Sequence, residues 1–166
     1  MTGRYAADRL NQDILLTSGH FSRHYGVPMA LFLWKKSYEL GSPEVDMQHR
    51  RLVGLINELS DAMMLRQGYR AIPHVLEELV DYVQLHFTSE ERLMNEMNYP
   101  ALTEHREEHL DFTGKIIELK ERYTRDHDVD AGELLRFMCE WLKNHIVARD
   151  QEFGRYMRRV EMGLEE

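Results

Sequence analysis

Five histidines and two carboxylates of this chain recur at spacings that suit metal binding. In chain order they read H…HxxxE…HxxxH…HxxxxD, and they are His49, His86, Glu90, His105, His109, His145 and Asp150. Each part falls on the apolar stripe of an expected helix, where burying an ionised group without a partner costs several kcal/mol. We therefore expect bound metal ions to compensate for the burial of these groups.

The size of the set points to two metal ions, because one zinc site uses only four ligands. Imidazole and carboxylate donors suit iron, zinc or manganese equally well. Two carboxylates that each bridge both ions, five imidazoles and a single-oxygen bridge supply eleven coordination bonds. Two octahedral ions need about twelve. One position therefore stays open for a small ligand, and dioxygen requires such a position on a redox-active pair.

Four long amphipathic helices are predicted to position these residues. Apolar side chains recur at three- and four-residue spacing over residues 49–63, 76–97, 102–123 and 134–145. Helices of about 20 residues joined by short turns are typical of an antiparallel up-down-up-down bundle. No alternating strand pattern competes with this interpretation. The predicted fold is therefore an all-α four-helix bundle.

Capping and breaking residues predict where the helices end. We expect Asp46 to cap the first helix, which stops near Gly68, and Pro73 to open the second. Asp130 and Glu133 resemble a capping box at the start of the fourth helix. An apolar N-terminal arm at residues 29–34 and a short C-terminal helix at residues 153–160 complete the expected fold.

Helix geometry predicts that the seven groups meet. The second and third helices each carry two of them four residues apart, so each pair shares one helix face. At about 1.5 Å of rise per residue, their distances from the turns place all seven in one layer of the bundle. His145 and Asp150 are five residues apart, about 140° around an ideal α-helix. They require a local distortion such as a π-bulge, or a site between the two directions.

The chain resembles the hemerythrins, specifically the bacterial hemerythrin-like domains, over roughly residues 31–156. The resemblance is carried by Trp34, Gly41 and the motifs DMQH (46–49), HFTSEE (86–91), NYP (98–100) and WLKNHIVARD (141–150), with His105 and His109 between the last two. It implies a four-helix bundle with a non-haem di-iron centre, bridged by an oxo or hydroxo group, that binds dioxygen reversibly.

The same resemblance implies a role for each matching residue. One iron is expected to bind His105, His109 and His145, while the other binds His49 and His86 and keeps the open position. Glu90 and Asp150 are expected to bridge the two ions. Leu142, one turn before His145, is expected to line an apolar ligand pocket. Phe87 and Trp141 flank ligands, and either the pocket or core packing explains them.

Three further acids lie next to the expected ligands but fall off the ligand faces of their helices. They are Glu91, Glu107 and Glu108, and we expect them to be solvated. Glu91 is the one substitute for Glu90 that the spacing allows.

Composition narrows the setting. At 166 residues, with 30% charged and 43% apolar side chains, the chain fits one soluble domain, which we place at residues 29–166 after a polar extension at 1–28 of unknown function. A net charge of −8 argues against nucleic acid or an anionic membrane as a partner. Cys139 is the only cysteine, no apolar run approaches the length of a membrane span, and the N-terminus has no apolar signal region. These features predict a cytoplasmic protein and leave any protein partner unidentified.

Three functions are compatible with such a centre. We expect dioxygen carriage, storage or delivery, with oxygen or redox sensing by the same site as the alternative. A di-iron oxidase or peroxidase is less favoured, because carboxylate-rich oxidase sites use paired Glu-x-x-His motifs. This chain has HxxxE and five histidines instead. We therefore expect a binding protein rather than an enzyme.

Overall fold

The computed structural model describes residues 30–164, so the predicted extension at 1–28 lies outside the described residues. The regular structure of residues 30–164 is helical, with no strand, as the sequence predicts. The described residues from Phe32 onward form one compact unit. In this described part, no helix combines the length and the apolar character needed to cross a membrane.

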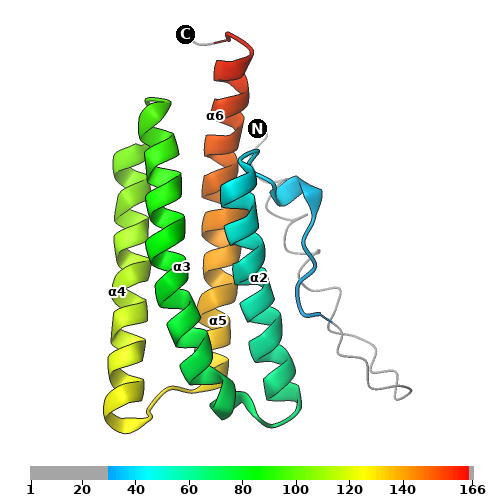
Figure 1. Ribbon diagram of the computed structural model, residues 1–166, viewed down its shortest axis with the longest axis vertical. Coiled ribbons are helices and arrows are strands. Elements are labelled where there is room, and N and C mark those ends of the chain that lie inside the picture. Colours follow the sequence, from blue (N-terminus) through cyan, green and yellow to red (C-terminus); the bar gives the residue numbers. More distant parts are fainter. Residues whose placement is uncertain (1–29, 165–166) are drawn as a thin grey trace, which may run out of the picture. The chain divides into compact units, whose positions relative to one another are not determined.

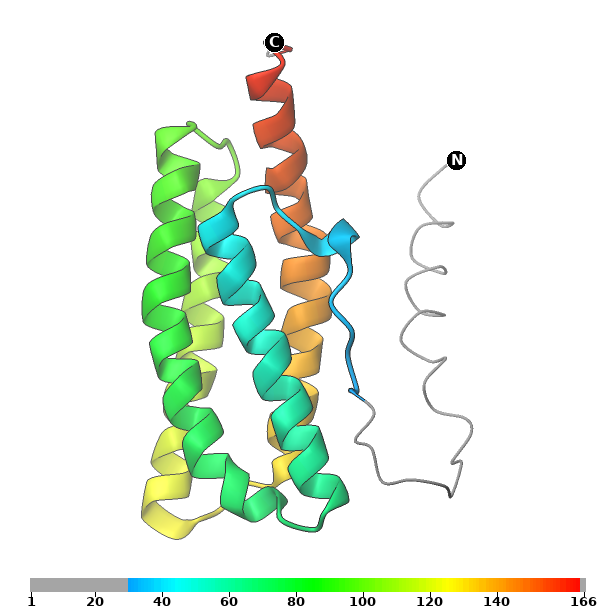
Figure 2. The same ribbon diagram turned by 45° about the vertical axis from the view of Figure 1, so that its right-hand side comes forward.

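Three long helices lie side by side with a rod built from three consecutive segments (Figure 1). The helices are α2 (Pro43–Met64), α3 (Gly68–Glu96) and α4 (Leu102–Asp126). The rod, drawn from gold to red, consists of α5 (Ala131–Trp141), the π-helix η2 (Leu142–Asp150) and α6 (Gln151–Glu161). It runs beside α2 in both views (Figure 2), and the 3-10 turn η1 (Lys36–Tyr38) precedes α2.

The core lies between these elements and uses the stripes that the sequence predicts. Its fully buried members include Leu52, Ile56, Leu59, Leu76, Leu79, Ile116, Leu119, Leu134 and Met138. Burying each such side chain contributes roughly 1.5–3 kcal/mol relative to leaving it in water. The core therefore holds the helices at a fixed separation on one side of the layer that carries the histidines.

The predicted start of the first helix is wrong by four residues, because the observed cap position is Ser42 and not Asp46. Helix α2 begins at Pro43, so Asp46 lies inside it and is not its cap. The buried Asp46 carboxylate instead accepts hydrogen bonds from the backbone N–H groups of Leu40, at 2.6 Å, and Gly41, at 3.2 Å. Asp46 therefore fastens the segment before α2, because its two oxygens satisfy backbone donors that burial would otherwise leave unpaired.

The predicted break between the first two helices is also wrong. Helix α3 begins at Gly68, so Pro73 lies inside it and does not open it. Arg66 adopts a left-handed backbone, with φ of 58°, and turns the chain within three residues. A Cβ atom on Gly68 would lie 2.9 Å from side-chain atoms of Met63 and Ala131, so only glycine fits this close turn. Pro73 has no backbone N–H and cannot donate the helical hydrogen bond at its position. The burial of Ile72 in this first part of α3 offsets that loss.

The predicted start of the fourth helix is confirmed in part. The Asp130 carboxylate accepts hydrogen bonds from the backbone N–H groups of Gly132 and Glu133 and so caps α5. The Glu133 side chain does not complete a capping box. It accepts two hydrogen bonds from Arg122 of α4, at 2.7 and 3.1 Å. Glu133 therefore ties α5 to α4 instead.

The segment before α2 packs against the bundle. Phe32 and Asn57 of α2 exchange two hydrogen bonds, at 2.8 and 2.9 Å, between the Phe32 backbone and the Asn57 side-chain amide. The centroids of the Trp34 and His49 rings lie 6.3 Å apart. On α6, Gly154 lets the Leu40 carbonyl approach, since a Cβ there would lie 3.0 Å from that oxygen. These contacts hold the segment next to the histidine layer.

Candidate metal centre

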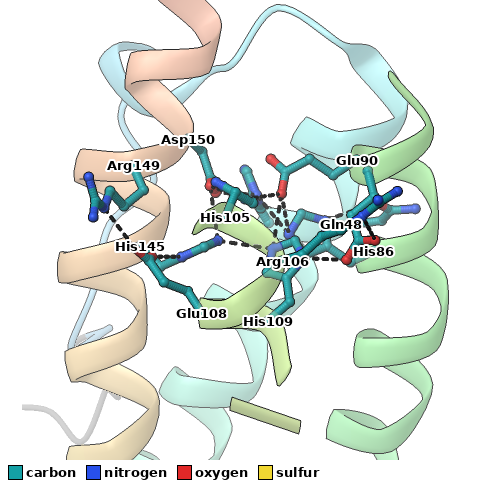
Figure 3. Close-up of polar contacts among 12 residues, drawn as sticks. Gln48, His86, Glu90, His105, Arg106, Glu108, His109, His145, Arg149 and Asp150 are labelled. Carbon is teal, nitrogen blue, oxygen red and sulfur yellow. Dashed lines mark hydrogen bonds and ion pairs between the residues drawn. The ribbon is translucent and has the colours of Figure 1, made fainter. Parts of the chain in front are cut away.

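All seven residues singled out by their spacing lie in one buried layer between the helices. Figure 3 labels all of them except His49. Helix α2 brings His49, α3 brings His86 and Glu90, α4 brings His105 and His109, and η2 brings His145 and Asp150. The most exposed of them, His105, shows only 5% of its surface to solvent. The prediction that these side chains converge is therefore correct.

The π-helix explains how His145 and Asp150 reach one site. Residues Leu142–Asp150 form the segment η2, whose hydrogen bonds run from residue i to i+5. Residues five apart therefore lie on one face, as residues four apart do in an α-helix. His145 Nε2 and Asp150 Oδ1 lie 3.2 Å apart. Of the two options that the sequence left open, the structure has the local distortion, as a π-helix over the whole segment.

Four of the donors form a three-histidine group: His105, His109, His145 and Glu90. The Nε2 atoms of His109 and His145 lie 3.0 Å apart. Glu90 Oε2 lies 3.0 Å from His105 Nε2 and 3.3 Å from His109 Nε2. Asp150 Oδ1 approaches the same group, 3.5 Å from His105 Nε2.

The remaining three donors, together with Glu90, which belongs to both groups, form a two-histidine group: His49, His86, Glu90 and Asp150. The Nε2 atoms of its two histidines lie 3.2 Å apart. Asp150 Oδ2 lies 3.1 Å from His49 Nε2, whereas its Oδ1 faces the three-histidine group. Glu90 Oε2 also lies 3.9 Å from His86 Nε2. Both carboxylates therefore stand between the two groups, each within reach of both.

The donor geometry fits metal ions. Ligands about 2.1 Å from an ion lie about 3.0 Å apart at the 90° angle of an octahedron and about 3.4 Å apart in a tetrahedron. The His109–His145 nitrogen pair, at 3.0 Å, matches the octahedral value, and the His49–His86 pair, at 3.2 Å, lies midway between the two values. Glu90 Oε1 and both Asp150 oxygens are buried without a hydrogen-bond partner. Such orphaned carboxylate oxygens are costly unless a cation satisfies them.

The electrostatics of the layer favour a neutral His86 and an ionised Glu90, which are the protonation states that binding of a cation needs. Burial lowers the pKa of His86 well below its ordinary value, and the adjacent His49 adds to this effect. Burial alone would raise the pKa of Glu90, but hydrogen bonds from His105 and His109 hold it well below its ordinary range. The layer therefore favours a neutral His86 and an ionised Glu90, as metal binding requires. At His105, burial favours the neutral form, but the hydrogen bond with Glu90 raises the pKa.

The outer nitrogens of three histidines have hydrogen-bond partners. Two of these partners, Glu108 and Glu91, were expected to be solvated, and the third is Gln48. His145 Nδ1 lies 2.7 Å from Glu108 Oε2, and His109 Nδ1 lies 2.8 Å from Glu91 Oε1. His86 Nδ1 lies 3.2 Å from Gln48 Oε1. Each acceptor favours the tautomer that carries the proton on Nδ1, which leaves Nε2 as a lone-pair donor.

The expectation that Glu91 and Glu108 are solvated is therefore wrong, whereas Glu107 is exposed as expected. A helical wheel assigns both acids to an outer face, but a glutamate is long enough to reach a histidine on the next helix. Glu91 of α3 thus reaches His109 of α4, and Glu108 of α4 reaches His145 of η2. The available signal was their position immediately beside Glu90 and His109.

Aromatic rings cover the imidazoles. Phe87 stacks on His109, with ring centroids 3.7 Å apart, and Trp141 stacks on His145 at 3.9 Å. Tyr82, which the sequence analysis did not single out, stacks on His86 at 4.7 Å. Burial raises the pKa of Tyr82 well above its ordinary value, so its hydroxyl stays protonated. Leu142 is fully buried in the main core.

Comparison with known proteins identifies the family. The profile of the hemerythrin HHE cation binding domain matches residues 40–157. Bacteriohemerythrin of Stenotrophomonas maltophilia (strain R551-3) is 35% identical over 126 residues, which cover 76% of this chain and 81% of the relative. Bacteriohemerythrin of Pseudomonas aeruginosa (strain LESB58) is 37% identical over 118 residues, which cover 71% of this chain and 76% of the relative.

A third relative is bacteriohemerythrin of Clostridium acetobutylicum (strain ATCC 824). It is 33% identical over 128 residues, which cover 74% of this chain and 98% of the relative. The region that the family profile matches contains all seven residues of the buried layer. This chain belongs to the hemerythrin family.

Proposed function

We propose that this chain binds dioxygen reversibly at a non-haem di-iron centre and acts in the cytoplasm as an oxygen carrier, store or delivery protein. Membership of the hemerythrin family implies binding of non-haem iron. His105, His109 and His145 would hold one iron, and His49 and His86 would hold the other. Glu90 and Asp150 would bridge the two ions, and the two-histidine iron would keep the open position for dioxygen.

The observation that carries this proposal is the unequal division of the donors. Three imidazoles serve one position and two serve the other, while both carboxylates stand between the two groups. Two octahedral ions that share the carboxylates and one oxygen bridge are then one ligand short. The shortage falls on the two-histidine position, which leaves room there for one small molecule.

The proposal includes the arrangement of the domain. Residues 29–166 form one hemerythrin-like unit, an antiparallel up-down-up-down bundle whose segment before α2 acts as an arm beside the site. Short connections between successive helices support this arrangement, as do the contacts of α2 with α3, of α3 with α4 and of α2 with α5. The hydrogen bonds between Phe32 and Asn57 support the role of the arm.

The residues of the chain favour reversible binding over turnover. Two iron ions in this layer would supply a redox pair that gives electrons to dioxygen and recovers them on release. The stacked rings of Phe87 and Trp141 and the buried side chain of Leu142 keep water away from the imidazoles, and exclusion of water suppresses side reactions. These three side chains form the apolar lining of the proposed ligand pocket.

The proposal is tested on full-length protein that is loaded with ferrous iron and reduced without air. We expect two iron ions per chain and a change in visible absorption when oxygen is admitted, which reverses when oxygen is removed. The same protein loaded with zinc is the control and should not respond to oxygen. Irreversible oxidation with release of peroxide would favour an oxidase, and an iron-loaded protein without any oxygen response would contradict the proposal.

A further inference from the structure

The two donor groups differ in what lies behind their histidines. In the three-histidine group, His109 and His145 each donate their Nδ1 proton to a carboxylate, at 2.8 and 2.7 Å. In the two-histidine group, His86 meets the neutral amide oxygen of Gln48 at 3.2 Å. His49 Nδ1 is buried without a hydrogen-bond partner. Negative charge therefore backs one metal position and not the other.

Each of the two carboxylates is held in place by an arginine. Arg149 Nε donates to Glu108 Oε1 at 2.7 Å, and Arg106 Nε donates to Glu91 Oε2 at 2.9 Å. Figure 3 shows Glu108 between the rod and the buried layer, in contact with His145 and Arg149. Exposed ion pairs contribute little to stability by themselves. These glutamates, however, are only 25% and 31% exposed, and each also binds a buried imidazole.

A carboxylate behind an imidazole changes the nitrogen on the other side of the ring. By attracting the Nδ1 proton it increases the electron density of the ring, so Nε2 becomes a stronger donor to a metal. A neutral amide oxygen attracts the Nδ1 proton less strongly and so adds less electron density to the ring. An imidazole whose Nδ1 has no hydrogen-bond partner gains no electron density in this way. Stronger donors bind a cation more tightly, and they stabilise a ferric ion more than a ferrous one because its charge is higher.

We propose that Glu91 and Glu108 are positioning residues that make the two metal positions unequal. Acting through His109 and His145, they strengthen metal binding at the three-histidine position and stabilise the ferric state there. Gln48 keeps the two-histidine position, where the ligand binds, free of this added charge. The proposal rests on the proposed function, because it assigns unequal properties to the two positions of the same di-iron site.

The test separates charge from orientation. Glu91→Gln and Glu108→Gln keep an oxygen that can accept the Nδ1 proton, but they remove the negative charge. Gln48→Glu adds a charge behind His86. Glu107→Gln is the matched control, because Glu107 lies on the same helix as Glu108, immediately before it, and is exposed. All four variants are made in the full-length chain.

The first measurement is Co2+ affinity, by competition with a chelator. We expect wild-type protein to bind two ions with unequal affinity. Glu91→Gln and Glu108→Gln should each weaken the tighter binding event by about tenfold or more, in line with other outer partners of metal ligands. Gln48→Glu should strengthen the weaker event. Glu107→Gln should match the wild type.

The second measurement is the midpoint potential of the iron-loaded protein. We expect it to be more positive in Glu91→Gln and Glu108→Gln and more negative in Gln48→Glu, always relative to Glu107→Gln. A tenfold change in the preference for ferric over ferrous iron corresponds to about 59 mV for one electron. A purely orienting role would leave the potential of the glutamine variants unchanged.

The outcomes distinguish this proposal from the proposed function. If the glutamine variants match Glu107→Gln in both measurements, the charge effect is absent and the proposal is wrong. If wild-type protein binds two Co2+ ions but its iron form does not respond to oxygen, the proposed function fails. The affinity measurement then still decides the role of the two glutamates, because it involves no oxygen.

Discussion

Asp150→Ala is expected to lose both metal ions rather than one. Oδ1 of this carboxylate lies 3.2 Å from His145 Nε2, and Oδ2 lies 3.1 Å from His49 Nε2, so one side chain serves both donor groups. Its loss removes a ligand from each position. We expect the affinity for each ion to fall by more than the roughly 100-fold that loss of an outer partner can cause. Iron per chain after gel filtration, measured by atomic absorption, checks this result.

Although Asp150→Ala should weaken metal binding, it should not lower the stability of the metal-free protein. Without metal, Asp150 is a fully buried carboxylate whose oxygens have no hydrogen-bond partner, and such a group is costly to the folded state. The metal-free Asp150→Ala protein should therefore melt at the same temperature as the metal-free wild type, or higher. Retention of two iron ions by the variant would contradict the bridging role of Asp150.

The adjacent acids Glu90 and Glu91 provide a matched comparison. Glu90→Ala should lower the iron content of both positions, because Glu90 stands between the two groups. Glu91→Ala should only weaken binding, because its carboxylate reaches the outer nitrogen of His109 and not the buried layer. Equal and complete loss of iron in the two variants would show that the carboxylates have been assigned wrongly.

Removal of metal is expected to lower the melting temperature of the wild-type protein by at least about 8–16 °C. Free metal at about 1,000 times its Kd stabilises a folded protein by about 4 kcal/mol for one site. For a domain of this size, each kcal/mol corresponds to roughly 2–4 °C, so one site alone gives this shift and a second site adds to it. The physical cause is the buried layer, in which seven polar side chains lose their compensating charge when metal is absent.

Thermal unfolding followed by circular dichroism, with and without a chelator, measures this shift. The control is Asp150→Ala, whose melting temperature should not respond to added metal. Amide hydrogen exchange should also become faster in η2 than in the core helices when metal is removed, because the proposed ligands His145 and Asp150 lie within that π-helix. A melting temperature that is the same with and without metal would contradict the proposed metal centre.

Much of this fold is predictable from the sequence because its signals are local and periodic. The stripes that contain Leu52, Leu79 and Ile116 repeat over several turns, and all three residues are buried in the core. The convergence of the seven donors follows from counting rise along the helices from each turn. Even the need for a distortion between His145 and Asp150 follows from the angle between them, and η2 provides it.

The features that sequence reasoning missed depend on tertiary contacts. A proline such as Pro73 normally opens a helix, but Gly68 packs closely against Ala131 and Ile72 is buried, so α3 begins five residues earlier. The contacts of Glu91 and Glu108 cross from one helix to the next, and their geometry depends on how the helices are rotated. Helical periodicity assigns a residue to a face, but it does not determine how far a long side chain reaches.

Anomalous scattering at the iron edge from crystals of the iron-loaded protein tests the metal centre most directly. Two peaks should lie within the buried layer, one about 2.1 Å from the Nε2 atoms of His105, His109 and His145. The other should lie at the same distance from the Nε2 atoms of His49 and His86, with Glu90 and Asp150 contacting both ions. A single peak, or iron bound outside this layer, would contradict the di-iron assignment.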